Sequence, residues 1–208
     1  MRIRITFSKQ GALRYTGHLD LHKLWERAAR RADIPLAYTQ GFHPTPRIQI
    51  ASALPLGFSS RCEVADFFLS ADLDVATLSS KLQPALPSGL SVLNVESVDE
   101  RSPALQTQLI AADYEVTLLE QADASNLDLR LAALTDAPTL PRVKRDKAYD
   151  LRPQIEELSL MAGAEKKIHM RLASRAGDTG RPEEVLAELN LAIEDVQVER
   201  TRLVFKDS

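Results

Sequence analysis

The order in which strand-like and helix-like patterns follow one another is the feature that most constrains the fold of this chain. Residues 2–7 alternate between polar and apolar side chains, which predicts a strand. Residues 18–33 carry apolar side chains at helical spacing, and Pro35 predicts the end of that helix because proline disfavours helical backbone in the residue before it. The next segments are predicted as strands over 46–51 and 62–70, a helix over 74–85 and a strand over 90–98. This is the order β-α-β-β-α-β.

A similar order recurs after Ser102-Pro103, which we interpret as a linker. The predicted elements are strands over 114–119, 139–145, 166–173 and 195–205, and helices over 123–136 and 182–191. Residues 146–165 form an insert to which the pattern assigns no element. We therefore predict an α+β protein of two tandem ferredoxin-like domains, residues 1–101 and 105–208. The RAMP nucleases that process CRISPR repeats have such an arrangement, but a likeness of fold implies no activity.

A single cysteine, Cys62, excludes an internal disulfide and a self-contained iron–sulfur cluster, which needs about four thiolates. The cysteine content is typical of the reducing cytoplasm, where we expect the protein to reside. No apolar run approaches the roughly 18 residues of a membrane span, and the segment MRIRITFSKQ is unlike a signal peptide. We therefore expect no membrane partner.

The net charge of −3 conceals an uneven distribution. Residues 1–61 contain ten Lys and Arg residues against three acids, whereas residues 62–104 contain two against seven. A segment with such a local excess of positive charge can bind an anion even within a nearly neutral chain.

Cations also recur on one side of the predicted strands. If the apolar residues of each strand face the helices, the alternate residues line the open side of the sheet. These residues are Arg2, Arg4, Arg47, Gln49, Arg142, Lys144, Lys167, His169, Arg171, Arg200 and Arg202. Guanidinium groups bind phosphate through paired N–H donors, although strand faces in water also carry arginine without any ligand. The face lacks the interleaved aromatic residues of an RNA-recognition motif.

The first predicted helix carries a basic stripe beside its apolar one. Lys23, Arg27, Arg30 and Arg31 stand at i, i+4, i+7 and i+8, with Arg14 shortly before the helix. A solvated helix face is the alternative explanation, but such faces usually interleave acids, and Glu26 stands alone near this stripe.

Proline stiffens the segment that follows. Gly41 permits a turn, while Pro44 and Pro46 fix two backbone angles on either side of Thr45. A plain edge-strand connection needs fewer such devices, so we predict a pre-organised binding loop. Its binding residues would be Gln40, Phe42, His43 and Arg47.

His18 and His22 stand four residues apart, a spacing that can bind a metal. The adjacent catalytic Glu of the zinc-protease helix is absent, and a third ligand would have to come from His43 or elsewhere. We therefore predict no metal and no cofactor. A polar contact at the helix start, or an anion-binding or acid–base role there, is the alternative for His18.

The stretch RITFSKQGALRYTGHLDLHKLWERAARRADIPLAYTQGFHPTPRIQIASALPLG resembles the opening of a bacterial family of radical-SAM-linked proteins of unknown function. DLRPQI (150–155) and GRPEEVLAEL (180–189) are similar to later landmarks of that family. The sequence departs from the pattern at His43, where asparagine is more usual. Members are fused to, or encoded beside, a radical SAM enzyme, so the resemblance implies such an enzyme as a partner. With Cys62 alone, this chain is not itself the radical SAM catalyst.

Three functions are therefore expected, the first being preferred. The chain is an RNA-binding accessory protein that presents tRNA or rRNA to a radical SAM modification enzyme. Alternatively, it is a docking module of that enzyme without RNA contact. The third alternative is a metal-independent endoribonuclease, in which His18, with Tyr15 or His43 and with Arg14 or Arg47, would supply the acid, the base and the cation. That arrangement requires the helix start and the proline-stiffened loop to meet.

Overall fold

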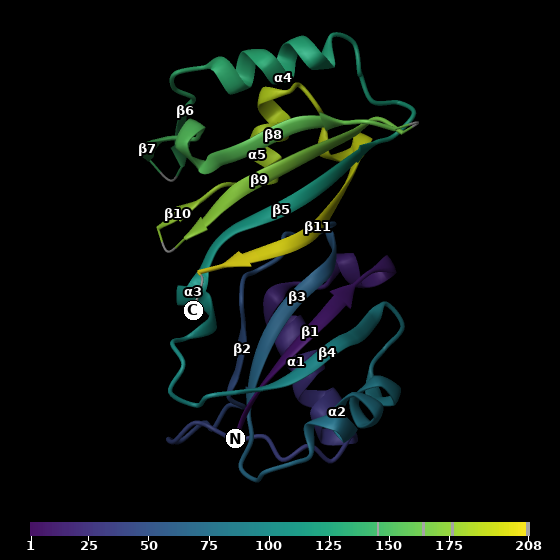
Figure 1. The fold of residues 1–208 in the computed structure, drawn as a ribbon, viewed down its shortest axis with the longest axis vertical. Helices are drawn as coiled ribbons and strands as arrows, with labels where there is room; N and C mark the ends of the chain where they lie inside the picture. Colours follow the sequence, from purple (N-terminus) through teal and green to yellow (C-terminus); the bar gives the residue numbers. More distant parts are fainter. Residues whose placement is uncertain (145, 164, 176, 207–208) are drawn as a thin grey trace. The chain divides into compact units, whose positions relative to one another are not determined.

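The computed structural model of the protein describes residues 1–144, 146–163, 165–175 and 177–206. The fold is mixed α+β, with mostly antiparallel sheet and few helices (Figure 1). The chain divides into two compact units, residues 1–108 and 109–208, which we call unit 1 and unit 2.

Unit 1 places its first strand in the middle of its sheet. The strands are β1 (Arg2–Lys9), β2 (Ile48–Ile50), β3 (Ser59–Phe68) and β4 (Leu90–Val98), in the spatial order β2-β3-β1-β4 with antiparallel neighbours. The helices are α1 (His18–Arg31), α2 (Val75–Leu82) and α3 (Leu105–Gln108), with short 3₁₀ turns η1 (Gly11–Tyr15) and η2 (Gln83–Ala85).

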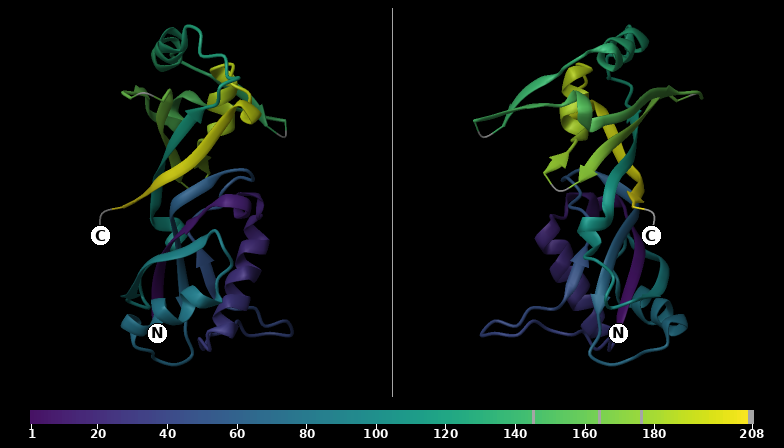
Figure 2. Two further views of the ribbon diagram at one scale, coloured as in Figure 1. Left: turned by 90° about the vertical axis from the view of Figure 1, so that its right-hand side faces the viewer. Right: turned by 60° about the vertical axis from the view of Figure 1, so that its left-hand side comes forward.

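The core of unit 1 follows from the alternation in β1. Ile3, Ile5 and Phe7 have no solvent exposure and pack with residues of α1, α2 and β3. Trp25 of α1 stands edge-on to Phe7, with ring centroids 4.9 Å apart, and burial of such a large ring dominates a core of this size. The helix stripe read from the sequence is therefore the buried one, and α1 lies along one side of the strands (Figure 2).

Unit 2 repeats this order of main elements with additions. Its main strands are β5 (Leu109–Leu118), β8 (Ile155–Met161), β9 (Lys167–Arg175) and β11 (Val196–Phe205), in the order β8-β9-β5-β11. The helices are α4 (Leu127–Asp136) and α5 (Pro182–Glu188), with turns η3 (Arg152–Gln154) and η4 (Ile193–Asp195). A short β10 (Asp178–Thr179) also pairs with β9, and β6 (Pro141–Lys144) and β7 (Lys147–Asp150) form a separate hairpin.

The structure corrects the sequence-based description of unit 2. The predicted strand 139–145 is one arm of the separate hairpin, as far as residue 144, and residue 145 lies outside the described residues. The predicted insert 146–165 contains β7 and β8, and β8 is a strand of the main sheet.

The sequence of β8, IEELSLM, alternates poorly because three of its apolar side chains fall within four residues, so the pattern gave no clear period. The fourth helix begins at Leu127 and not at 123, after Asn126, whose φ of 51° lies outside the helical region.

Candidate nucleic-acid interface

Two of the sheet cations predicted to contact a ligand are held by a buried acid. Arg2 is only 2% exposed and donates through Nε and Nη2 to Oδ2 of Asp66, at 3.0 and 2.6 Å. Arg4, directly opposite Asp66 in the sheet, donates to both carboxylate oxygens at 2.8 and 3.0 Å, and these hydrogen bonds raise the pKa of Arg4. The expectation that Arg2 faces open solvent is therefore wrong, because the pairing register places an acid beside it.

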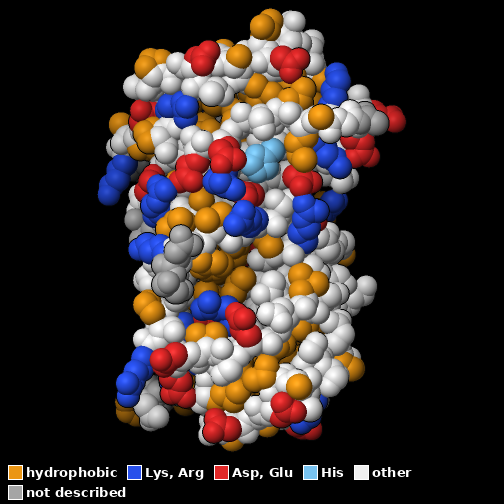
Figure 3. Space-filling model, in the orientation of Figure 1, with side chains coloured by type: hydrophobic (Ala, Val, Ile, Leu, Met, Phe, Trp, Pro, Cys, Tyr) orange, Lys and Arg blue, Asp and Glu red, His pale blue; other side chains and the backbone are white. Residues whose placement is uncertain are grey.

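Unit 2 contains a similar arrangement. Arg171 lies opposite Asp113 and donates to both of its carboxylate oxygens at 2.6 and 3.0 Å, which raises the pKa of Arg171. A third hydrogen bond from Arg171 reaches Glu157 at 2.6 Å. Two other predicted cations are also paired, Lys167 with Glu165 and Arg142 with Glu188, and the side chain of Lys144 lies outside the described part of the chain. On the side seen in Figure 3, cations and carboxylates are interspersed, so the predicted guanidinium-rich face carries much compensating negative charge.

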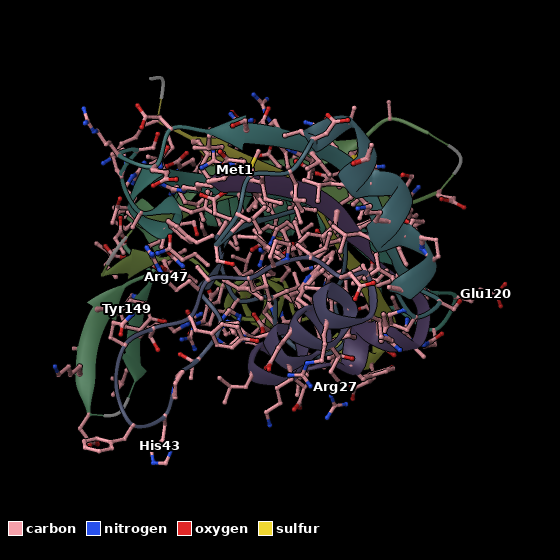
Figure 4. All side chains as sticks on the ribbon, turned by 90° about the horizontal axis from the view of Figure 1, so that it is seen from below. Met1, Arg27, His43, Arg47, Glu120 and Tyr149 are labelled. Carbon is pink, nitrogen blue, oxygen red and sulfur yellow. The ribbon has the colours of Figure 1, made fainter. Side chains whose placement is uncertain are left out.

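Arg47 is an exception among the sheet cations. It is exposed, and its guanidinium carbon lies 4.1 Å from the ring centroid of Phe68, at cation–π distance. Its backbone N–H donates to the carbonyl of Ala37 at 2.8 Å, which fixes the strand start after Pro46. The proline-stiffened segment thus delivers an ordered and accessible Arg47 (Figure 4).

The segment before Arg47 is an ordered hairpin with an exposed tip. Tyr38 and Pro46 form a bridge, and Thr39 N–H donates to the carbonyl of Thr45 at 2.9 Å. Phe42 at the tip is 102% exposed, and its neighbours Gln40 and His43 are exposed as well. Figures 2 and 4 show this hairpin projecting from the body of unit 1. An aromatic ring held in solvent on a stiff hairpin is available to stack on a ligand.

The predicted basic stripe of α1 lines a pocket of about 490 Å³. On the helix side the lining residues stand at i, i+3, i+4, i+7 and i+11, one face of successive turns. They are Asp20, Lys23, Leu24, Arg27 and Arg31, and Leu13, Thr16 and Pro87 complete the lining. Arg27 points outward from the helix in Figure 4.

The cations of this pocket differ in whether they are already paired. Lys23 makes only a loose contact with Asp20, at 3.9 Å. Arg27 and Arg31 form no ion pair with any residue that the structure describes. Arg30, the fourth member of the stripe, does not line the pocket and pairs with Glu26 at 2.9 Å. Three of the four stripe cations therefore converge, two of them without a partner in the described chain.

The wall of the pocket opposite α1 is held in place by buried hydrogen bonds and close backbone packing. Lys9 is almost fully buried and donates through Nζ to the carbonyl of Thr16 at 2.9 Å. Gln10 N–H donates to the carbonyl of Gly89 at 2.7 Å, two residues after the lining residue Pro87. Gly89 has a φ of 91°, and a Cβ there would lie 2.5 Å from the Gln10 carbonyl oxygen, so glycine is required for this close approach. No sequence pattern pointed to Pro87 or Leu13, because only the fold brings these segments to α1.

His18 and His22 of α1 make no contact with His43 among the described residues. His22 Nε2 lies 3.3 Å from the carbonyl oxygen of Ile48, while burial, together with His22, lowers the pKa of His18 against an opposing effect of Glu63. No cluster of three or more metal-ligating side chains occurs among the described residues.

His18 and His43 lie on different elements of unit 1, since His18 starts α1 and His43 lies in the exposed hairpin. Helix α1 follows the end of β1 where Lys9 pairs with Ser60, whereas the hairpin is anchored by Ala37 on the carbonyl of Phe68. No hydrogen bond or ring contact among the described residues joins Arg14, Tyr15 or His18 to His43 or Arg47, so the contact that the ribonuclease hypothesis required is not seen. Arg14 instead lies over the ring of Tyr15, at 4.9 Å from its centroid.

The two later landmarks of the sequence meet at a second pocket, of about 320 Å³, in unit 2. Its lining residues are Tyr149, Gln154, Gly177, Thr179 and Arg181. A Cβ at Gly180 would lie 3.0 Å from the carbonyl oxygen of Gln154, so DLRPQI and GRPEEVLAEL pack directly on each other. Tyr149 donates to Glu184, and burial together with this carboxylate raises the pKa of Tyr149 to about 12. The landmarks signalled this region in the sequence, but nothing signalled Tyr149.

None of the helices in the described ranges has the length and apolar character that crossing a bilayer requires.

No curated protein matches the chain. Similar solved structures include a crystal structure of a Cbf5-Nop10-Gar1 complex, with a TM-score of 0.47 and 11% identity over 99% of this chain and 50% of that chain. A crystal structure of the archaeal box H/ACA sRNP Nop10-Cbf5 complex gives a TM-score of 0.46 and 11% identity, over 99% and 49%. The chain spans about half the length of these solved chains.

The family described as "Uncharacterized protein conserved in bacteria (DUF2344)" matches residues 2–182, which is most of the chain, and the protein therefore belongs to that family.

Proposed function

We propose that the protein is an RNA-binding accessory protein whose RNA site is the α1 pocket. The observation that carries this proposal is the convergence of Lys23, Arg27 and Arg31 on one pocket with a fixed opposite wall. Protein–RNA binding rests on phosphate neutralisation by Lys and Arg, and arginines without carboxylate partners lose no ion pair when phosphate arrives. The paired cations Arg2, Arg4 and Arg171 serve the fold instead.

The hairpin gives the same unit a second RNA contact. Residues 32–37 connect the Arg31 end of α1 directly to Tyr38, where the hairpin starts. Stacking of a base on an exposed ring such as Phe42 is worth about 1–3 kcal/mol and tolerates any sequence. A pocket for phosphates followed by a stacking tip suits single-stranded or looped RNA, whose bases are free to leave the helix.

The same proposal includes a radical SAM enzyme as the protein partner, with the chain presenting tRNA or rRNA to it in the cytoplasm. The likeness to radical-SAM-linked proteins described above supports this partner. Tandem ferredoxin-like folding is part of the proposal as well. The strand orders β2-β3-β1-β4 and β8-β9-β5-β11, with one helix after the first strand and one before the last in each unit, support it.

The test is fluorescence anisotropy with labelled tRNA and with a short single-stranded RNA at several salt concentrations. Combined Arg27→Gln and Arg31→Gln substitution should weaken binding about a hundredfold or more, since each lost charged hydrogen bond is worth about 1.5–3 kcal/mol. Arg30→Gln is the matched control, because Arg30 lies on the same helix outside the pocket. Absence of RNA binding at low salt, or an equal effect of the control, overturns the proposal.

A docking module without RNA contact is the second candidate. Exposed apolar side chains near the start of α1 favour it, namely Tyr15, Leu19 and Leu56. Co-purification of the protein with a radical SAM enzyme from the same bacterium tests this candidate. Loss of co-purification in Leu19→Ser and Leu56→Ser, together with unaltered co-purification when Arg27 and Arg31 are replaced and no RNA affinity in the wild type, would favour docking over RNA binding.

A further inference from the structure

One acid stands among the cations of the α1 pocket. Asp20 lines the same pocket as Lys23, Arg27 and Arg31, and its side chain is 72% exposed. Its nearest described cation, Lys23 Nζ, is 3.9 Å away, so its oxygens are not taken up by a close ion pair. A site for phosphate alone gains nothing from such a carboxylate, because like charges repel.

A carboxylate in a phosphate-binding pocket can accept a hydrogen bond from a ligand that carries an O–H or N–H group near its phosphates. The remaining lining supports such a ligand, since Leu13, Leu24 and Pro87 offer apolar surface and Thr16 offers a hydroxyl. Ribonucleotides combine phosphate, the apolar face of a base and a 2′-hydroxyl donor, and that hydroxyl lets proteins distinguish RNA from DNA. An acidic side chain that accepts a hydrogen bond from a ribose hydroxyl is a known device in nucleotide sites.

The spacing along α1 separates the carboxylate of Asp20 from the guanidinium groups of Arg27 and Arg31. Asp20 and Arg27 are seven residues apart, about 10 Å along the helix axis, and Arg31 lies about 6 Å beyond Arg27. The acid thus occupies one end of the pocket and the two arginines without described partners the other. A ligand lying along this face of α1 would therefore meet the acid and the arginines at different positions.

We propose that this pocket selects ribonucleotides over deoxyribonucleotides, with Asp20 accepting a hydrogen bond from a ribose 2′-hydroxyl while Arg27 and Arg31 bind phosphates. The inference rests on the proposed RNA-binding function and adds a specificity-determining residue to it. Asp20 lies in the first turn of α1, and the N-cap residue of this helix is Gly17, so the helix does not use the Asp20 carboxylate as a cap. Its replacement should therefore leave the helix in place.

The test compares three single-stranded oligonucleotides of one sequence, made of RNA, DNA and 2′-fluoro RNA, by anisotropy with the full chain. The fluoro probe retains an RNA-like sugar but lacks the hydroxyl donor, so it separates hydrogen bonding from sugar shape. Wild type should bind RNA about tenfold more tightly than either other probe, the value of one hydrogen bond to a charged group. Asp20→Asn should reduce this preference several-fold, because a neutral amide oxygen accepts a weaker hydrogen bond than a carboxylate, and strengthen DNA binding, because a repulsive charge is removed.

Asp33→Asn is the matched control. It removes the same charge just beyond α1, outside the pocket, and its left-handed φ of 53° is tolerated by asparagine. The control should change the affinities for all three probes by one common factor. Equal wild-type binding of RNA and DNA, equal binding of RNA and the fluoro probe, or an unchanged preference in Asp20→Asn overturns this inference alone. Absence of binding to all three probes overturns the proposed function as well.

Discussion

Asp66 holds Arg2 inside unit 1 with hydrogen bonds of 2.6 and 3.0 Å, and both side chains are almost fully shielded from water. The same guanidinium donates to the carbonyls of Ser102 and Pro103, at 2.6 and 3.0 Å. The first strand is thereby tied to the chain that leaves the last strand of the unit. Arg2 therefore stabilises the fold, whereas Arg27 and Arg31 of α1 are accessible to a ligand.

Asp66→Asn should destabilise the protein by about 3 kcal/mol, because two guanidinium groups would lose their buried counter-charge. Urea unfolding followed by circular dichroism measures this change. Asp72→Asn provides the control, since Asp72 is almost fully exposed and should alter stability by less than about 0.5 kcal/mol. Equal unfolding free energies of the two variants would show that Asp66 does not stabilise the fold.

Gly89→Ala should be more destabilising than Gly11→Ala, although both glycines have positive φ, 91° and 60°. A Cβ at position 89 meets the carbonyl oxygen of Gln10 at 2.5 Å, whereas one at position 11 meets nothing within 4 Å. Overpacking of this kind costs about 1–3 kcal/mol beyond the backbone strain that the two variants share. Thermal and urea unfolding of the pair measure the difference. Similar stability of both variants would contradict the close packing of the Pro87 wall.

The salt dependence of RNA binding should identify which arginines contact phosphate. Each phosphate contact contributes a slope of about −0.7 to the plot of log affinity against log salt for single strands. Arg27→Gln and Arg31→Gln should each make this slope shallower by about that amount, and Arg30→Gln should leave it unaltered. An unchanged slope in all three variants would place the phosphate contacts elsewhere.

Stability should fall as pH rises between about 10 and 12, in part through Tyr149. The pKa of Tyr149 is raised from 10.0 to about 12, so in this range the folded protein retains a phenol proton that the unfolded chain releases. The difference in unfolding free energy between wild type and Tyr149→Phe should therefore decrease as pH rises through this window. Ultraviolet titration of tyrosinate should show one late-ionising tyrosine fewer in the variant. A difference that stays constant with pH would contradict the partly buried hydrogen bond to Glu184.

The elements of unit 1 could be predicted from sequence because each has its own clear period. The apolar residues of β1 and the Leu21–Trp25–Ala28 stripe of α1 are buried where the pattern placed them. The ends were less exact, since β3 spans Ser59–Phe68 against a predicted 62–70 and β2 spans Ile48–Ile50 against 46–51. The polar residue Ser60 enters β3 through pairing with Lys9 of β1, which a local pattern does not report.

The candidate site, too, could be predicted only in part from the sequence. Helical spacing alone brought Lys23, Arg27 and Arg31 onto one face, and the structure adds a pocket beneath them. Strand alternation named Arg2 and Arg171 as exposed cations, but it could not show that Asp66 and Asp113 lie beside them. Charge pairing across a sheet depends on register, and register is a property of two distant segments.

The central position of β1 in unit 1 also has a consequence for biosynthesis. Both neighbours of this strand, β3 and β4, are made after it, and the last of them ends only at Val98. At about 5–20 residues per second, the apolar side of β1 waits on the order of ten seconds at the ribosome for its second neighbour. During that interval Ile3, Ile5 and Phe7 form part of an unpaired, aggregation-prone strand. The nascent chain is therefore expected to need chaperone protection until about one hundred residues have been translated.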